Sequence, residues 1–379
     1  CALENIPEIH DTELLFEMLR AMGATVEKTG RTSAVIDTSA LNSATVPYEL
    51  SKHMRASYYF IGSLLGRFGQ ACVSMPGGCN FGVRPIDQHI KGFELLGAEI
   101  RIENGLIYAD AEKMQGAHIY FDQVSVGATI NVMLAAVKAE GMTVLENVAK
   151  EPHIVDLANF LNSMGADIRG AGTDVIKIRG VDVLHGTDYS IIPDQIEAGT
   201  YMAAAAAVGG DVLVKNVIPK HLEPITAKLR EAGAVITEGD DWVRVVRTGT
   251  LHRINLKTMP HPGFPTDMQP QIAAMLTCAE GTSIITEGVW DNRFRYTEQL
   301  VRMGARITVD GKVAVIEGVK GLQGAPVKAC DLRGGAAVII AGLMAKGTTE
   351  IEETQHIERG YENVVEKFAG LGADLHYIT

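Results

Sequence analysis

The chain has 379 residues, of which 46% are hydrophobic and 21% charged, a composition typical of a globular protein with room for two hydrophobic cores. Its net charge of −12 argues against nucleic acid or an anionic membrane surface as a partner, so an anionic substrate needs basic residues gathered locally. No apolar run reaches the roughly 18 residues that span a bilayer and no signal peptide opens the chain, so membrane insertion is not expected.

A short signature recurs six times along the chain: a helix-like stretch, then Gly-Ala, then an apolar strand. Its glycines are separated by 74, 68, 68, 71 and 68 residues, a regularity that chance rarely produces. Five of the repeats also have an Ala/Leu/Met-rich helix before a β-branched strand, and a second, amphipathic helix after it. The repeated glycines are Gly23, Gly97, Gly165, Gly233, Gly304 and Gly372.

The first helix of these five repeats is apolar on all sides, which is typical of a helix buried within the fold. One repeat of about 70 residues cannot cover such a helix alone, so several repeats must pack together. We therefore predict an α/β protein with helices inside and sheets outside, divided into two domains of three repeats, 1–192 and 193–379. A substrate cleft is expected between the domains.

The first repeat starts at the strand CALENI and has no apolar helix before it. The sixth repeat stops at HYIT without a closing strand. Because the other repeats have both elements, we expect the sequence to lack an N-terminal segment that supplies them.

The second repeat departs most from the others, in the segment SMPGGCNFGVRPID. Glycines flank Cys79, and Arg84 follows five residues later, so a reactive thiolate is one interpretation and an inert thiol in a loop is the other. Cys72, Cys278 and Cys330 lie in strand or helix patterns and are expected to pack in the interior. The scattered, odd number of cysteines predicts reduced thiols in the cytoplasm, with no metal site and no cofactor.

Charged residues stand at the starts of several predicted helices, where the free amides and the helix dipole favour anions. For a single arginine a solvated charge is the simpler interpretation, but equivalent positions of several repeats share the pattern. Asp267 and Asp331 could equally be helix N-caps, and so could Ser125 in SVGAT. The arginines at these starts are Arg55, Arg293, Arg333 and Arg359.

The motifs PGGCNFGVRPID, MRAS, DQVSVGAT, FPTDMQ, DNRF, DLR and HIERGYE resemble those of the UDP-N-acetylglucosamine enolpyruvyl transferases, in register over essentially the whole chain. The resemblance implies two inside-out α/β domains. It also implies transfer of enolpyruvyl from phosphoenolpyruvate to the 3-hydroxyl of UDP-N-acetylglucosamine, with release of phosphate, in peptidoglycan synthesis.

By the same resemblance, Cys79 adds to phosphoenolpyruvate or protonates its methylene carbon, and is the residue that fosfomycin alkylates. Asp267 matches the general base for the sugar hydroxyl. Arg84 and Arg359 match phosphoenolpyruvate ligands, and Asp331 matches an acidic residue coupled to Arg333. Supporting anion contacts are implied for Arg55, Arg293 and Arg333, and nucleotide-sugar contacts for Arg84, Pro85, Ile86, Asp87, Gln88, Gln123, Ser125, Val126, Gly127 and Val289.

The family's N-terminal Lys-Asn pair has no match here, so activity is expected of the full-length protein and not necessarily of this piece of it. The nearest alternative is an enzyme like 3-phosphoshikimate 1-carboxyvinyltransferase, which shares the scaffold but not the PGGC loop. A second alternative is a non-catalytic paralogue that binds the nucleotide sugar. A binding protein has no need of a general base, which argues against it.

Overall fold

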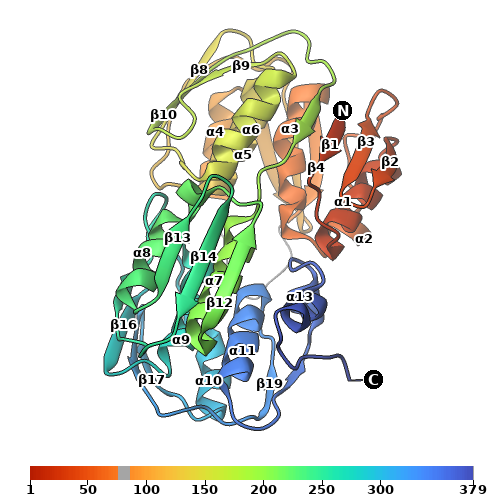
Figure 1. Ribbon diagram of the computed structural model, residues 1–379. Coiled ribbons are helices and arrows are strands. Elements are labelled where there is room, and N and C mark those ends of the chain that lie inside the picture. Colours follow the sequence, from red (N-terminus) through yellow and green to blue (C-terminus); the bar gives the residue numbers. More distant parts are fainter. Residues whose placement is uncertain (76–85, 379) are drawn as a thin grey trace. The chain divides into compact units, whose positions relative to one another are not determined.

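The computed structural model describes residues 1–75 and 86–378. The chain folds into two compact units, which we call the N-terminal unit (Cys1–Ile192) and the C-terminal unit (Pro193–Thr379). Each unit has its own large hydrophobic core. Figure 1 shows both units built from helices and small sheets, as the predicted α/β class requires.

Three helices in contact with one another form the centre of the C-terminal unit: α7 (Gln195–Val208), α9 (Gln269–Leu276) and α11 (Leu332–Met344). Every residue of α9 is buried, and Ala203–Ala207 of α7 are buried as well. Small side chains let these helices approach closely, and their mostly apolar surfaces are buried on all sides. The predicted buried helices are therefore present.

The N-terminal unit contains a corresponding pair, α3 (Phe60–Phe68) and α5 (Val126–Ala136). They pack so closely that a Cβ built on Gly62 would lie 2.1 Å from the carbonyl oxygen of Asn131, and the Gly62 amide donates to the Asn131 side chain at 3.0 Å. The first repeat begins at strand β1, and the described residues of this unit hold no third helix of this kind.

The second helices of the repeats are amphipathic, and each ends just before one of the six repeated glycines. All six glycines have φ between 95° and 103°, a left-handed conformation that a side chain would strain. Shared backbone geometry at equivalent positions confirms the sixfold repeat. These helices are α1 (His10–Ala21), α4 (Asp87–Leu95), α6 (Pro152–Ser163), α8 (Glu223–Glu231), α10 (Thr297–Arg302) and α13 (Val364–Gly370).

Small sheets surround the central helices within each unit (Figure 1). An antiparallel set of three strands forms the common part: β4–β6–β5, β8–β10–β9, β12–β14–β13, β16–β18–β17 and β1–β3–β2. A further strand pairs in parallel with the first of the set in three of these sheets, as β7 with β8, β15 with β16 and β11 with β1, and β19 pairs in parallel with β20. In the cases of β7, β15 and β19, the buried helix connects the parallel pair, which is a βαβ crossover.

The strand bounds in the N-terminal unit are β1 (Ala2–Glu4), β2 (Thr25–Gly30), β3 (Ser33–Asp37), β4 (Gln70–Ser74), β5 (Glu99–Glu103), β6 (Leu106–Asp110), β7 (His118–Tyr120), β8 (Met142–Glu146), β9 (Asp167–Arg169), β10 (Val175–Arg179) and β11 (Asp188–Ser190). Those in the C-terminal unit are β12 (Gly210–Lys215), β13 (Val235–Glu238), β14 (Trp242–Arg247), β15 (Asn255–Lys257), β16 (Thr282–Thr286), β17 (Arg306–Asp310), β18 (Val313–Glu317), β19 (Pro326–Lys328) and β20 (Glu350–Glu352).

Short helices complete the described chain: α2 (Tyr48–Ser51), α12 (Gln355–Glu358) and four 3₁₀ turns, Arg55–Tyr59, Pro219–Leu222, Thr266–Met268 and Arg293–Tyr296. Three of the 3₁₀ turns lead directly into α3, α9 and α10, and they carry Arg55, Asp267 and Arg293. Among residues 1–75 and 86–378, no helix combines the length and apolar character needed to cross a bilayer.

Candidate active site

The Asp267 carboxylate is shared by two arginines of the C-terminal unit. Arg293 donates from Nη2 to Oδ1 at 2.9 Å, and Arg333 donates from Nε to Oδ2 at 3.3 Å. The side chain of Asp267 is 42% exposed, whereas those of Arg293 and Arg333 are only 4% and 13% exposed. A partly exposed carboxylate is therefore held in place by two largely buried arginines, and each of its oxygens accepts from a different one.

Asp267 is not a helix cap. It lies within the 3₁₀ turn before α9, whose N-cap residue is Met268, and no side-chain cap bond is made there. The N-cap interpretation of Asp267 is therefore wrong, because both carboxylate oxygens face the arginines. Arg293 also donates to the backbone carbonyl of Thr266 at 3.1 Å, which fixes the turn itself.

Asp331 is the N-cap of α11, as its alternative interpretation predicts. Its Oδ1 accepts from the backbone amides of Arg333 at 3.0 Å and Gly334 at 2.9 Å. The cap fixes the first turn of α11 and with it the backbone from which the Arg333 side chain reaches Asp267. The contact between Asp331 and Arg333 is thus made by the backbone amide of Arg333.

A buried glutamate, absent from the sequence-based candidates, supports the neighbouring loop. Glu287 is 1% exposed, and its Oε1 accepts from the amides of Val289 at 2.8 Å and Trp290 at 3.0 Å. Its Oε2 accepts from the Thr266 hydroxyl at 3.0 Å. One carboxylate therefore connects the loop that carries Val289 to the turn that carries Asp267.

Arg359 differs from its predicted position. The sequence places it at the start of the second helix of the sixth repeat, but it is the C-cap residue of α12, ahead of α13. The helix is interrupted here because Asn363 takes a left-handed conformation with φ of 46°. Arg359 is half-buried, two residues before the buried Tyr361.

A second group of predicted residues lies at the N-terminus of α5 in the N-terminal unit. Ser125 caps this helix by accepting from the Ala128 amide at 3.2 Å. A Cβ built on Gly127 would lie 2.5 Å from the Tyr58 hydroxyl and 2.8 Å from Nε2 of His89. The helix start is thus closely covered by two side chains that only a glycine accommodates.

His89, on α4, is the notable member of this group, and the sequence reasoning missed it. It is 7% exposed, and neither ring nitrogen has a hydrogen-bond partner among the residues that the structure describes. Burial, assisted by the positive charge of Arg55, lowers the pKa of His89 from 6.5 to about 4. The imidazole is therefore neutral at pH 7 and has one donor and one acceptor unused by the described chain.

The other predicted nucleotide contacts of this unit lie around α4 and the approach to α5. Ile86 is the N-cap residue of α4 and is buried, Asp87 is exposed in the first turn, and Val126 begins α5. Gln88 is buried, and its Oε1 accepts a hydrogen bond from the backbone amide of Asp122 at 2.9 Å. This bond connects α4 to the segment before α5. Gln123 is exposed in that segment.

Arg55 begins the 3₁₀ turn that leads into α3, as the sequence predicts. Its guanidinium carbon lies 5.8 Å from the ring centroid of Tyr58, whose ring in turn meets that of His89 edge-on at 5.1 Å. Arg55, Tyr58 and His89 are therefore neighbours of the α5 N-terminus, and we call these residues with Ser125 and Gly127 the α5 cluster.

Cys79, Arg84 and Pro85 lie outside the described residues. Three of the other cysteines are half-buried, less enclosed than the interior packing predicted for them. Burial raises the pKa of each of these thiols: Cys72, Cys278 and Cys330. Thiolate formation at neutral pH is thus disfavoured at all three.

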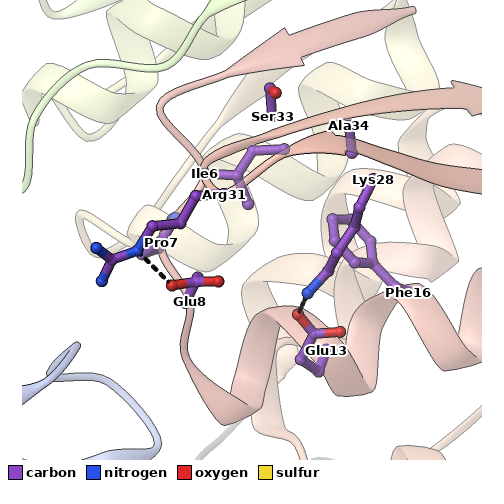
Figure 2. A pocket seen from close by; sticks show the side chains of 9 residues that line it. All are labelled: Ile6, Pro7, Glu8, Glu13, Phe16, Lys28, Arg31, Ser33 and Ala34. Carbon is purple, nitrogen blue, oxygen red and sulfur yellow. Dashed lines mark hydrogen bonds and ion pairs between the residues drawn. The ribbon is translucent and has the colours of Figure 1, made fainter.

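The cavity in Figure 2 is separate from both groups of residues. It has a volume of about 10 Å³, room for a single water molecule. Ion pairs of Arg31 with Glu8 and of Lys28 with Glu13 border it. It is lined by Ile6, Pro7, Glu8, Glu13, Phe16, Lys28, Arg31, Ser33 and Ala34, and is too small for an organic substrate.

Comparison with known proteins identifies the family. Residues 1–368 match the family model of EPSP synthase (3-phosphoshikimate 1-carboxyvinyltransferase). The chain belongs to this family. Within it, UDP-N-acetylglucosamine 1-carboxyvinyltransferase 3 of Caldanaerobacter subterraneus subsp. tengcongensis is 62% identical over 373 residues, covering 98% of the chain and 89% of the relative. The UDP-N-acetylglucosamine 1-carboxyvinyltransferase of Clostridium botulinum is 55% identical over 375 residues, covering 99% and 90%.

Solved structures of the family share this fold. The enolpyruvyl transferase NikO from Streptomyces tendae is 28% identical, with a TM-score of 0.90 over 99% of the chain and 89% of its own. An EPSP synthase from Acinetobacter baumannii is 21% identical, with a TM-score of 0.75 over 98% of the chain and 89% of its own, a likeness of fold alone. The predicted enolpyruvyl transferase fold is confirmed.

Proposed function

We propose that the protein transfers the enolpyruvyl group of phosphoenolpyruvate to the 3-hydroxyl of UDP-N-acetylglucosamine and releases phosphate, the first committed step of peptidoglycan synthesis. Relatives that are 62% and 55% identical over nearly the whole chain have this activity in their names. The solved shikimate-pathway enzyme of the same family is only 21% identical. The nucleotide sugar is therefore the better-supported acceptor.

The arrangement of Asp267 with Arg293 and Arg333 is the observation that carries a catalytic role. A carboxylate that is 42% exposed and oriented through both oxygens can accept the proton of a sugar hydroxyl. A protein that only binds a nucleotide sugar would gain nothing from two arginines buried around such a group. We assign Asp267 as the general base.

The chemistry accounts for the remaining residue types. Protonation of the methylene carbon of phosphoenolpyruvate leaves a cationic carbon, which the 3-hydroxyl oxygen attacks as Asp267 takes its proton. The resulting phosphate ketal loses phosphate and a methyl proton to give the enol ether. Arginines stabilise the carboxylate and phosphate throughout. For these contacts we propose Arg84, Arg293, Arg333 and Arg359, with Cys79 as the acid for carbon.

We propose that the α5 cluster holds the nucleotide part of the substrate. The positive end of the α5 dipole suits a phosphate oxygen. Gly127 lets Tyr58 and His89 pack closely over this helix start, where their polar atoms are placed for a ligand. Arg55 adds a positive charge nearby, and the neutral His89 can donate one hydrogen bond. Ile86, Asp87, Gln88, Gln123 and Val126 are the neighbouring contacts in this proposal, and Val289 is the contact beside the sugar. A cytoplasmic location remains a prediction from the cysteines.

Phosphate release by the full-length protein tests the proposal. We expect release from phosphoenolpyruvate to require UDP-N-acetylglucosamine and to be absent with shikimate 3-phosphate. The same nucleotide sugar should raise the melting temperature. Release with shikimate 3-phosphate alone would establish the alternative acceptor, and stabilisation by the nucleotide sugar without phosphate release would establish the non-catalytic paralogue.

A further inference from the structure

A hydrogen-bonded group behind Arg333 joins the three central helices of the C-terminal unit. Tyr361 lies at its centre and is 2% exposed. Its hydroxyl oxygen lies 2.9 Å from Thr200 Oγ1 on α7. It also accepts a hydrogen bond from Nε2 of Gln271, on α9, at 3.3 Å. Arg333 of α11 donates from Nη1 to the same hydroxyl at 3.2 Å. Three repeats thus meet at one oxygen atom.

The direction of each bond follows from the donors available. Thr200 uses its hydroxyl proton on the carbonyl oxygen of Ile196 at 2.8 Å, one turn back along α7. Tyr361 must therefore donate its own hydroxyl proton to Thr200 Oγ1. The lone pairs of the Tyr361 oxygen are then available to accept from Arg333. A guanidinium has donors only, so the Arg333 bond has a single possible direction. Tyr361 is thus oriented by Thr200 and holds Arg333 in turn.

Arg333 donates hydrogen bonds both to this group and to the proposed base. Its Nη1 donates to Tyr361, and its Nε donates to Oδ2 of Asp267. The guanidinium carbon also lies 5.6 Å from the centroid of the Tyr361 ring. Because the guanidinium is planar and rigid, fixing Nη1 fixes the direction in which Nε points. The hydroxyl of Tyr361 therefore sets the orientation of the arginine on Asp267.

We propose that Tyr361 is a positioning residue for the reaction, which acts through Arg333 to hold Asp267 in the orientation that accepts the proton of the sugar. Thr200 and Gln271 anchor the tyrosine. This inference rests on the proposed function, since it assigns a further residue to the same site. Removing the hydroxyl leaves a buried guanidinium donor without its acceptor, so the arginine must turn and Asp267 loses a fixed partner.

A double-mutant cycle separates positioning from packing. Tyr361→Phe removes one oxygen and keeps the ring, and Arg333→Lys removes the planar group through which the tyrosine acts. We expect Tyr361→Phe to lower kcat about tenfold, as expected for a displaced catalytic group, with little change in the KM for UDP-N-acetylglucosamine. In the Arg333→Lys background the same substitution should have almost no further effect on kcat.

Tyr201→Phe is the matched control. Tyr201 is a partly buried tyrosine of α7 whose ring packs on Phe368, and its hydroxyl makes no hydrogen bond among the described residues. We expect this variant to keep the unsubstituted kcat. If Tyr361→Phe does not fold, Thr200→Val removes the anchor and leaves the tyrosine in place, and a smaller fall in kcat with the same non-additivity is expected.

Each outcome decides the proposal. Equal fractional losses from Tyr361→Phe in the presence and absence of Arg333 would show that the tyrosine contributes only to folding, and so would a kcat within twofold of the unsubstituted enzyme. Failure of the proposed function is recognised separately, because the unsubstituted full-length protein would then release no phosphate with UDP-N-acetylglucosamine.

Discussion

The two groups of site residues differ in how far the protein itself satisfies them. In the C-terminal unit, Asp267, Arg293 and Arg333 are bonded to one another and to the backbone. In the α5 cluster, the buried imidazole of His89 has no partner among the described residues. One group is held in a fixed arrangement by the protein, whereas the other presents a neutral imidazole donor beside the N-terminus of a helix.

The difference corresponds to two kinds of task. Proton transfer depends on orientation, so fixed charges that need not reorganise during the reaction are favourable. Binding of a phosphate gains more from donors that are desolvated in advance but not yet used. Changes in the C-terminal group should therefore act mainly on kcat, and changes in the α5 cluster mainly on KM and on stability.

The largest effect is expected from Asp267→Asn. The amide has nearly the size of the carboxylate but cannot accept a proton, so kcat should fall by roughly 10²–10⁴. Phosphate release at saturating substrates measures this loss. The shift in melting temperature caused by UDP-N-acetylglucosamine is the control and should remain. A variant with more than a tenth of the original kcat would place the base elsewhere and remove the distinction between the two groups.

Cys79 extends the comparison to a residue outside the described structure. Because burial raises the pKa of Cys72, Cys278 and Cys330, we expect fosfomycin to alkylate Cys79 in preference to them, and faster with the nucleotide sugar present. Peptide mapping of the treated full-length protein locates the adduct. Cys79→Asp keeps a group that can donate a proton, so activity should persist while alkylation is lost.

Labelling at Cys278 or Cys330 would contradict the assignment of Cys79 as the acid. Loss of both activity and labelling in Cys79→Asp would instead point to an obligatory covalent role for the thiol.

His89 should make the stability of the protein depend on pH. Its pKa is about 4 in the folded protein against 6.5 unperturbed, so between these values the unfolded chain binds a proton that the folded chain does not. Stability therefore falls as the pH drops from 6.5 towards 4, by at most roughly 3 kcal/mol from this residue. Melting temperatures of the protein and of His89→Gln at pH 7 and pH 4.5 measure the effect.

The loss between the two pH values should be smaller in His89→Gln than in the unsubstituted protein, because glutamine does not titrate. Equal losses would mean that the imidazole is protonated in the folded protein, and the contrast between a neutral His89 and the ion-paired C-terminal group would not hold.

Much of this architecture could be predicted from the sequence, because repetition supplies six observations of one pattern. The spacing of Gly23, Gly97 and their counterparts gives the repeat, and their shared left-handed conformation explains why glycine recurs. Apolar character on all sides identifies the buried helices. Departures from the pattern then indicate the starts of helices, where Arg55, Asp267 and Arg293 lie.

The sequence could not provide the contacts that orient these residues. Tyr361 lies in the motif HIERGYE, yet only its bonds to residues 28 and 161 positions away reveal a role. Glu287 and His89 appear as ordinary members of a strand end and a helix, and burial alone distinguishes them. Asp267 could be a cap or a base by its local sequence, and only its contacts with arginines from two other segments argue against the cap.

The smallest effect is expected from Gly127→Ala. In a helix, alanine is favoured over glycine by about 1 kcal/mol, so the substitution would stabilise α5 if space allowed. A Cβ here would, however, lie 2.5 Å from the Tyr58 hydroxyl and 2.8 Å from His89 Nε2, so one of these side chains must move. We expect the KM for UDP-N-acetylglucosamine to rise about tenfold, equivalent to about 1.4 kcal/mol of binding, with kcat nearly unchanged.

Gly321→Ala is the control, since a Cβ on Gly321 meets no atom within 4 Å. Steady-state kinetics with each substrate varied in turn distinguishes the outcomes. An unchanged KM would mean that the ligand does not approach the start of α5. A fall in kcat at constant KM would mean that this cluster takes part in the chemical step, and the division of labour between an orienting group and a binding group would then be wrong. A rise in KM confined to the nucleotide sugar, with phosphoenolpyruvate unaffected, is what that division requires, because only the acceptor substrate carries the diphosphate that the positive end of the α5 dipole would hold.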